Sequence, residues 1–357
     1  MKRVVVKIGS NVLTRKDGTL DTDRMASLTD QVARLRAEGI EVILVSSGAV
    51  ASGRGEVAPV RKLDSVAARQ LFSAVGQAKL INIYYNLFNK YNIVCGQVLT
   101  TKESLSTRQH YLNQRNCMRV MLENGVVPIM NENDTISVTE LMFTDNDELS
   151  GMVATMMDAD ALIILSNIDG IYSGDPSSPE SEVIRTVGGD IEDLSQYIST
   201  TRSSFGRGGM LTKCRIACKV ADEGVEVIIA NGKRDDILCD LVLSDKDTLC
   251  TRFTPAQKQI SNLKKWIAHS DGFSKGELHI NEGAYEALMQ PQATSLLPVG
   301  VVSVEGEFEK DDIVTIVAPS GEHIGVGRVA MDSVTSNESI GVKGLRAIVH
   351  YDYLYME

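Results

Sequence analysis

The chain has no long apolar run. A membrane-spanning helix needs about 18 consecutive apolar residues, and no stretch of the 357-residue sequence approaches this length. Between Met1 and Lys7, only the three apolar residues 4–6 precede the next lysine. A secretory signal requires a longer apolar core. We therefore expect a cytoplasmic protein that does not associate with a membrane.

Cysteine pairs of the kind that bind zinc are also missing. The six cysteines are scattered, and no Cys-x-x-Cys pair occurs. Cys214 and Cys218 lie one helical turn apart and could share a metal ion, but no further Cys or His is spaced to complete that site. We expect free and mostly buried thiols.

Several nucleotide-binding signatures are absent. The sequence contains neither the HRD nor the DFG motif of protein kinases. It also lacks the GxxxxGK[ST] and GxGxxG loops. His110 is the only histidine before residue 269, so general bases are scarce. A carboxylate substrate needs no such base, because its pKa of about 4.3 leaves it ionised at pH 7. Two lysines and a Mg²⁺ ion would then suffice for phosphoryl transfer.

Length and charge indicate two different parts. A chain of 357 residues is long enough for two domains. The net charge is −11, and residues 271–357 hold 14 acidic against 5 basic side chains, a net charge of −9. So acidic a segment should repel a phosphate backbone. No nucleic-acid partner is expected.

Strand and helix patterns alternate over the first 250 residues. Apolar, β-branched runs predict strands at 3–8, 41–45, 93–99, 126–130, 161–165 and 225–229. Amphipathic segments predict helices at 24–38, 64–89, 108–123 and 211–223, the first of them capped by Asp23. This alternation predicts an α/β fold, an αβα sandwich around a mostly parallel sheet.

The pattern changes after residue 251. Short apolar segments at 299–304, 313–317, 324–329 and 347–350, separated by turns, predict a small β-rich domain. We therefore expect a catalytic domain at 1–252, a linker at 253–270 and a second domain at 271–357.

Polar residues follow three of the predicted strands. Lys7 and Gly9 end the first strand, and a lysine there can neutralise a phosphate or simply be solvated. The segment 46–49, Ser-Ser-Gly-Ala, followed by Gly53 and Gly55, suits either a ligand cradle or a tight turn. The run 131–134, Asn-Glu-Asn-Asp, suits the ammonium and carboxylate of an amino acid better than a plain loop. Ligands of such sheets bind at these strand ends.

Two further segments precede helices. Asp145 can cap the helix that follows it, which leaves Asp147 to orient lysines or a Mg²⁺ ion. Residues 206–213, Gly-Arg-Gly-Gly-Met-Leu-Thr-Lys, form a glycine-rich loop before a helix. Its N–H groups can wrap ATP phosphates, with Lys213 reaching the transferred group. A merely flexible loop would have the same composition.

Taken in order, these segments resemble the glutamate 5-kinase family of the amino-acid kinase superfamily. The resemblance is carried by VVVKIGSNVL, VILVSSGAVASGRG, VVPIMNENDTIS, TDNDELSGMVA and GRGGMLTK, and by a C-terminal stretch similar to a PUA domain. It implies the amino-acid kinase fold, ATP and Mg²⁺, L-glutamate as acceptor and the first step of proline biosynthesis. It further implies feedback inhibition by proline and a homo-oligomer, a dimer or tetramer.

The resemblance also assigns residues. It makes Lys7, Lys213 and Asp147 catalytic, with Asp147 organising the two lysines. It assigns glutamate binding to Ser47, Asp134 and Asn146. Contacts to ATP are assigned to Lys7, Ser166, Asn167, Arg207, Gly208, Gly209, Met210, Leu211, Thr212 and Lys213. Three of these depart from the usual pattern of the family: Asn167 stands where an Asp is common, Arg207 replaces a Thr and Leu211 replaces a Ser.

Two alternatives remain. A sibling enzyme, acetylglutamate kinase or aspartokinase, would share the fold and the lysines, although the 131–135 and 144–148 segments argue against it. An RNA-binding or RNA-modifying protein is the second alternative, since PUA domains often bind RNA. The −9 charge of that segment argues against RNA.

Overall fold

The chain forms two compact units, Met1–Gln259 and Ile260–Glu357. The computed structural model describes residues 1–136, 146–176, 178, 180–188, 210–244, 246–256, 262–270, 273–290 and 294–356. Each unit has its own apolar core. Within the described part of the chain, no helix is long and apolar enough to cross a bilayer.

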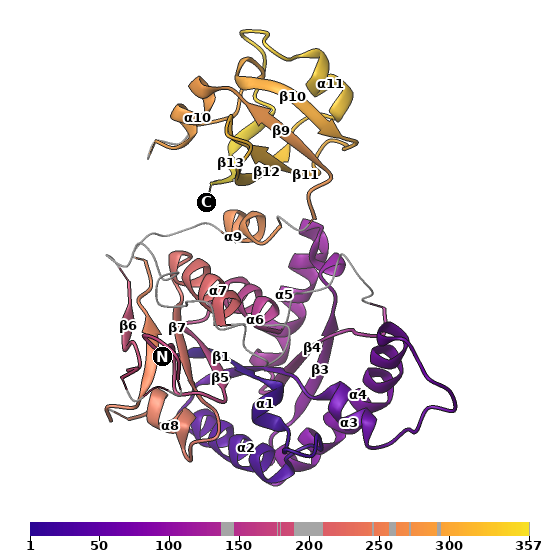
Figure 1. Ribbon diagram of the computed structural model, residues 1–357, viewed down its shortest axis with the longest axis vertical. Helices are drawn as coiled ribbons and strands as arrows, with labels where there is room; N and C mark the ends of the chain where they lie inside the picture. The colour runs from indigo at the N-terminus through magenta and orange to yellow at the C-terminus, as the bar shows by residue number, and fades with distance from the viewer. Residues whose placement is uncertain are drawn as a thin grey trace. The chain divides into compact units, whose positions relative to one another are not determined.

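An eight-stranded sheet is the centre of the first unit (Figure 1). Its order is β3-β4-β2-β1-β5-β7-β8-β6. The first six strands in this order, from β3 to β7, are all parallel to one another. At the other end of the sheet β8 pairs antiparallel with β7, and β6 pairs parallel with β8. The strands are β1 Arg3–Ile8, β2 Glu41–Ser46, β3 Cys95–Thr100, β4 Val127–Glu132, β5 Ala161–Ser166, β6 Thr186–Val187, β7 Glu226–Asn231 and β8 Cys250–Phe253. The predicted mostly parallel sheet is confirmed.

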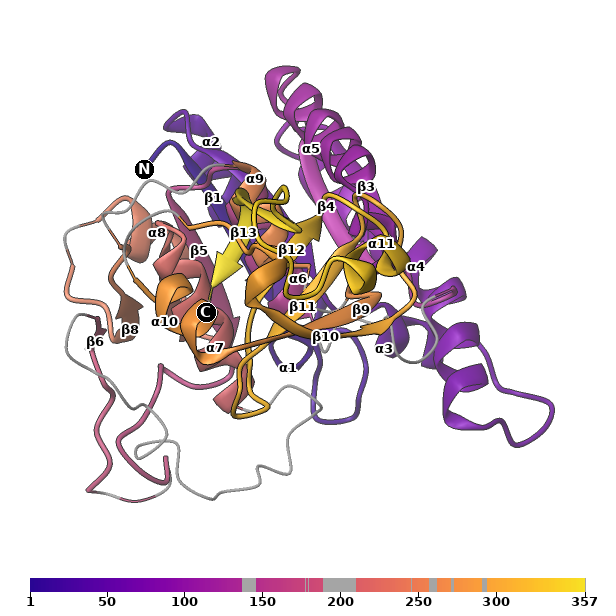
Figure 2. The ribbon, with the colours of Figure 1, turned by 90° about the horizontal axis from the view of Figure 1, so that it is seen from above.

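Helices cover both faces of this sheet, which confirms the αβα sandwich. On one face, alternate residues of β1 pack in a core with α2 Thr22–Ala37, α4 Ser65–Asn89 and α8 Ile237–Val242. On the other lie α5 Arg108–Glu123, α6 Asn146–Met156 and α7 Met210–Asp222 (Figure 1). Figure 2 shows α5 alongside β4. Because strand side chains alternate, Val4, Val6 and Ile8 face α2, and Lys7 faces α6.

The helix starts follow capping chemistry. Asp64 caps α4 by accepting hydrogen bonds from two backbone N–H groups in its first turn. The predicted cap Asp23 is wrong for α2. Asp21 is the N-cap, and its carboxylate accepts from Arg24 N at 3.1 Å, while Asp23 lies in the first turn. There its charge suits the helix dipole.

The second unit is built on a five-stranded sheet in the order β10-β9-β11-β12-β13. The strands are β9 Gly276–Ile280, β10 Val301–Gly306, β11 Ile313–Val317, β12 His323–Val329 and β13 Val349–Met356, with helices α9 Asn262–Ala268, α10 Glu282–Leu288 and α11 Ser333–Glu338. The β-rich character was predicted, but β9 was not. The helix α9 falls in the expected linker 253–270 and packs against β12 and β13.

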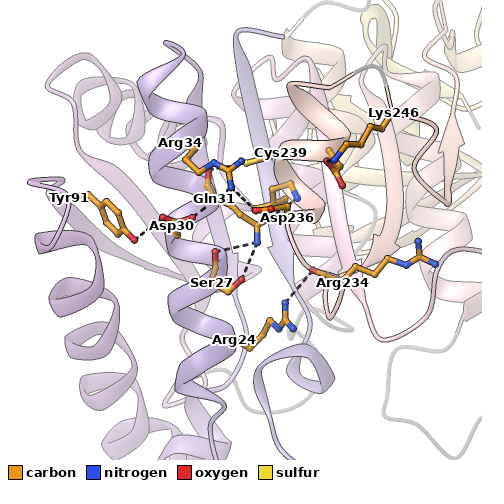
Figure 3. Close-up of polar contacts among 12 residues, drawn as sticks. Arg24, Ser27, Asp30, Gln31, Arg34, Tyr91, Arg234, Asp236, Cys239 and Lys246 are labelled. Carbon is orange, nitrogen blue, oxygen red and sulfur yellow. Dashed lines mark hydrogen bonds and ion pairs between the residues drawn. The ribbon is translucent and has the colours of Figure 1, made fainter.

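Gln31, a buried residue of α2 that is labelled in Figure 3, contacts the start of α8. Gln31 is 1% exposed, and its Oε1 accepts a hydrogen bond from the Leu238 N–H at 2.8 Å. The N-cap residue of α8, Asp236, makes no side-chain capping bond. Gln31 therefore supplies the acceptor that a first-turn N–H needs. On the exposed side, Arg34 and Asp236 form an ion pair at 2.5 Å.

Replacing Gln31 should destabilise the protein more than breaking this ion pair. Gln31→Met keeps the side-chain volume but leaves the buried Leu238 N–H without an acceptor, which should cost about 1–3 kcal/mol. The matched variant Arg34→Ala removes a solvent-exposed pair and should change the unfolding free energy far less. Urea unfolding of both variants measures the difference. Equal midpoints would contradict this role for Gln31.

Candidate active site

A cavity of about 540 Å³ opens at the carboxyl ends of β1, β2, β4 and β5. The strand register explains why these ends meet: Ile8 lies beside Ser46 of β2 and Leu165 of β5. In a parallel sheet all such ends share one edge. The predicted residues that line this cavity are Lys7, Ser47, Asp134, Asn146, Ser166, Asn167 and Lys213. The structure therefore brings together residues from widely separated segments.

Two lysines flank one buried carboxylate. Lys7 Nζ lies 2.5 Å from Asp147 Oδ1, and Lys213 Nζ lies 2.8 Å from Asp147 Oδ2. The Asp147 side chain is fully buried, and those of Lys7 and Lys213 are 7% and 13% exposed. Each carboxylate oxygen thus faces its own ammonium group. The three residues carry a net positive charge, which leaves the group attractive to an anion.

The ionisation of Asp147 follows from these contacts. Burial alone would raise its pKa, because desolvation disfavours the charged form. The ammonium groups of Lys7 and Lys213 outweigh burial and lower the pKa to about 2. Asp147 therefore stays negative at pH values well above 2. Its stabilising effect is present above the ordinary pKa and is lost only as the pH falls toward 2.

Helix positions explain how the three charges come together. Asp147 and Glu148 lie in the first turn of α6, where the helix dipole favours negative charge. Lys213 lies in the first turn of α7, where the dipole disfavours a cation. The ion pair with Asp147 offsets that cost. Since α6 and α7 pack against each other, both first turns reach the end of β1.

An amide network runs through the predicted glutamate-binding residues. Asn146 Nδ2 donates to Ser47 Oγ at 2.9 Å and to Asn131 Oδ1 at 3.0 Å. Asn131 Nδ2 in turn donates to Gln77 Oε1 at 2.9 Å. Because Ser47 Oγ accepts a bond here, its own hydroxyl hydrogen can be donated to a substrate oxygen. The network fixes the orientation of Ser47 and Asn146 at the cavity.

Asp134 is held by an arginine of α4. Arg69 Nη2 lies 2.5 Å from Asp134 Oδ1 and 3.2 Å from Glu132 Oε2. Burial raises the pKa of Asp134, and Arg69 opposes this effect. Two carboxylates therefore converge on one guanidinium at the cavity wall, and their combined charge exceeds that of Arg69. This wall is suited to a substrate ammonium group.

The serine and glycine segment after β2 has two structural functions. Gly48 has φ of 111°, a left-handed conformation that favours glycine, where the chain turns from β2 into α3 Ala49–Arg54. A Cβ at Gly53 would lie 1.9 Å from the carbonyl oxygen of Phe72. Gly53 therefore allows α3 to pack directly on the α4 backbone. The tight turn and Gly53 packing leave Ser47 and Ala49 at the cavity.

The predicted nucleotide-contact residues are only partly described. Ser166 ends β5, and Ser166 and Asn167 line the cavity. Met210, Leu211, Thr212 and Lys213 form the first turn of α7. Arg207, Gly208 and Gly209 lie outside the residues that the structure describes, as does the predicted cap Asp145.

Arg69, Asn131 and Glu132 line the cavity but were absent from the predicted set. Arg69 lies near the start of α4, more than 60 positions from its partners Glu132 and Asp134. Asn131 belonged to a predicted polar segment but had no role of its own. A charged Arg in a helix that otherwise packs through small and apolar residues was the available signal for Arg69.

Family comparisons agree with both units. Residues 2–231 match the amino acid kinase family, and residues 276–346 match the PUA domain. The carbamate kinase from Giardia lamblia bound to AMP-PNP superposes with a TM-score of 0.51. It is 16% identical and aligns over 71% of this chain and 99% of that one. This similarity shows a shared fold for the first unit.

Full-length relatives are much more similar. The chain is 65% identical to a glutamate 5-kinase from Bacteroides thetaiotaomicron, over 99% of this chain and 98% of that protein. It is 47% identical to a glutamate 5-kinase from Chlorobaculum tepidum, over 99% and 97% of the two chains. The chain therefore belongs to the glutamate 5-kinase family of the amino acid kinases.

Proposed function

We propose that this protein transfers the γ-phosphoryl group of ATP to the γ-carboxylate of L-glutamate, the first step of proline biosynthesis. The observation that carries the proposal is the pair of lysines around Asp147, beside a wall of amide and carboxylate groups in one cavity. The cationic part suits phosphate, and the polar wall suits a free amino acid. The cavity can therefore accommodate both the phosphate donor and the amino-acid acceptor.

The chemistry needs no general base. A glutamate carboxylate is ionised at neutral pH, with an ordinary pKa of about 4.3. One of its oxygens attacks the γ-phosphorus, the bond from that phosphorus to the bridging oxygen breaks, and ADP leaves with the bonding electrons. The products are γ-glutamyl phosphate and ADP. Catalysis then consists of positioning and charge stabilisation.

Lys7 and Lys213 would supply that stabilisation, and Asp147 would position them. Its carboxylate keeps both ammonium groups at the end of β1 in a largely buried setting. Charges in such a setting act strongly on charge that develops in the transition state. Because the Asp147 side chain contacts both lysines, we regard it as a positioning residue.

Glutamate would bind along the polar wall. Ser47 can donate a hydrogen bond to a carboxylate oxygen, and Asn146 Oδ1 and Asp134 can accept from the α-ammonium group. The Asn146 to Ser47 hydrogen bond and the Arg69 to Asp134 ion pair hold these groups in place before substrate arrives. Preorganisation of this kind lowers the entropic cost of binding.

ATP and Mg²⁺ are proposed as the donor and its metal. The lysine pair, Ser166 and Asn167 line the cavity and suit a polyphosphate, and we propose that the segment 207–213 also contacts it. Among the described residues, the cavity carboxylates Glu132 and Asp134 both face Arg69. Mg²⁺ would therefore be held by phosphate oxygens. When bound, it neutralises charge on those oxygens.

Other properties of the family are proposed for this chain as well. We expect a cytoplasmic homo-oligomer, a dimer or tetramer, with proline as feedback inhibitor. The acidic C-terminal unit should not bind RNA, because its −9 charge opposes a phosphate backbone. Domain limits at 1–252, 253–270 and 271–357 remain predictions.

The substrate assignment can be tested by trapping the acyl phosphate. With ATP, Mg²⁺ and hydroxylamine, L-glutamate should give hydroxamate, and N-acetylglutamate and aspartate should give little. Acetylation removes the charge that Asp134 is proposed to recognise, and aspartate is one methylene too short to reach the lysines. Turnover of N-acetylglutamate at or above the glutamate rate would refute the assignment.

Single substitutions should separate chemistry from binding. Lys7→Ala and Lys213→Ala should each lower kcat about a hundredfold or more, since removal of one such charge typically costs about 3 kcal/mol in the transition state. Asp134→Asn should mainly raise the KM for glutamate. Steady-state kinetics on variants with unchanged circular dichroism provides the measurement. A near-normal kcat in both lysine variants would show that phosphoryl transfer occurs elsewhere.

A further inference from the structure

Four side chains with metal-binding atoms meet on the outer face of the second sheet. Glu277 and His279 lie on β9, and their neighbours Leu278 and Ile280 point into the core. Because strand side chains alternate, Glu277 and His279 share the outer face. Glu305 of β10 lies directly opposite Glu277. His323, the first residue of β12, reaches the same place.

The distances between these groups are short and nearly equal. His279 Nε2 lies 3.4 Å from Glu277 Oε2 and 3.4 Å from Glu305 Oε1. One ligand atom from each of these three residues lies within 4.8 Å of the others. His323 Nε2 is 3.6 Å from the other oxygen of Glu277. Glu277, His279 and Glu305 therefore face one point, and His323 lies beside it, next to Glu277.

Hydrogen bonding does not account for this arrangement. His279 Nε2 is a buried nitrogen without a hydrogen-bond partner, although two carboxylates face it. Two glutamates directly opposite each other on neighbouring strands also repel. A cation between the carboxylates would remove the repulsion and give the nitrogen a partner. The surrounding segment, with a net charge of −9, adds a favourable field for a cation.

The geometry points to a binding site for one Zn²⁺ ion, held by Glu277, His279 and Glu305, with His323 as fourth ligand. Zinc lies about 2.1 Å from nitrogen and oxygen ligands, so neighbouring ligands of a tetrahedral site are about 3.4 Å apart. That is the separation found around His279 Nε2. Imidazole ligands favour zinc over Mg²⁺ and Ca²⁺, which prefer oxygen.

Access and location are consistent with a bound ion. A cavity of about 590 Å³ is lined by Glu277, Glu305 and His323 and is open to solvent. The side chains of Glu305 and His323 are 66% and 64% exposed, so both can adjust to close around the ion. The site lies wholly within the second unit. Zinc there would link β9, β10 and β12 and stabilise this unit, independently of phosphoryl transfer.

Zinc titration of the full-length protein tests the site. Tag-free protein without nucleotide is titrated with ZnCl₂ in a calorimeter, with thermal unfolding followed in parallel. We expect one high-affinity ion per chain, a higher Tm with zinc, and no displacement by excess Mg²⁺. His279→Ala and Glu305→Gln should weaken binding beyond the roughly 10- to 100-fold loss typical of outer-shell changes, and should abolish the Tm shift.

A second histidine provides a matched control. His350 Nδ1 lies 3.4 Å from Asp352 Oδ2 in the same unit, and neither residue belongs to the metal-binding group of Glu277, His279 and Glu305. His350→Ala should leave zinc affinity unchanged. Glu305 is largely exposed, so Glu305→Gln should fold normally even if His279→Ala does not. The proposal would be overturned if Glu305→Gln bound zinc as tightly as the wild type, or if His350→Ala lost as much zinc affinity as His279→Ala. Displacement of bound zinc by Mg²⁺ would overturn it too.

Discussion

The site depends on a carboxylate that is kept charged out of water. Burying Asp147 alone would favour its neutral form, and burying Lys7 or Lys213 alone would do the same for an amine. Together the three remain ionised, because each carboxylate oxygen lies within 2.8 Å of an ammonium group. Three elements of the first unit provide the residues of this ion-pair cluster. The central strand β1 supplies Lys7, and the paired helices α6 and α7 supply the other two groups.

The remaining polar groups follow the same rule of fixed partners. Asn146 connects the two lysines and Asp147 to the proposed glutamate-binding residues. It precedes Asp147 in the chain and donates hydrogen bonds to Ser47 and Asn131. Arg69 plays the corresponding part for Asp134 and Glu132. A reaction whose nucleophile is already ionised gains most from such preorganised charges. This explains how a site with few histidines can catalyse phosphoryl transfer.

Sequence patterns predicted what depends on short-range rules. Strand ends placed Lys7, Ser47 and Asp134 at one edge, and the helix dipole placed Asp147 in a first turn. The partner of Asp134 was not predictable in this way, because Arg69 meets it only through the packing of α4. The strand β9 was missed since polar Glu277 and His279 alternate with only two core residues. The proposed metal site depends on how β9, β10 and β12 align with one another, and the hydrophobic periodicity of the sequence does not predict that alignment. Local capping misled once, at Asp23, because neighbouring aspartates suit the same helix end.

The central claim is that Asp147 acts through the two lysines, and a double-mutant cycle tests it most directly. The kcat values of Asp147→Asn, Lys213→Ala and the double variant are compared with that of the wild type, after folding has been checked by circular dichroism. If Asp147 positions Lys213, its loss should matter much less once Lys213 is gone, so the double variant should retain a kcat well above the product of the single effects. Effects that multiply would show that Asp147 acts independently of Lys213 and would contradict the account.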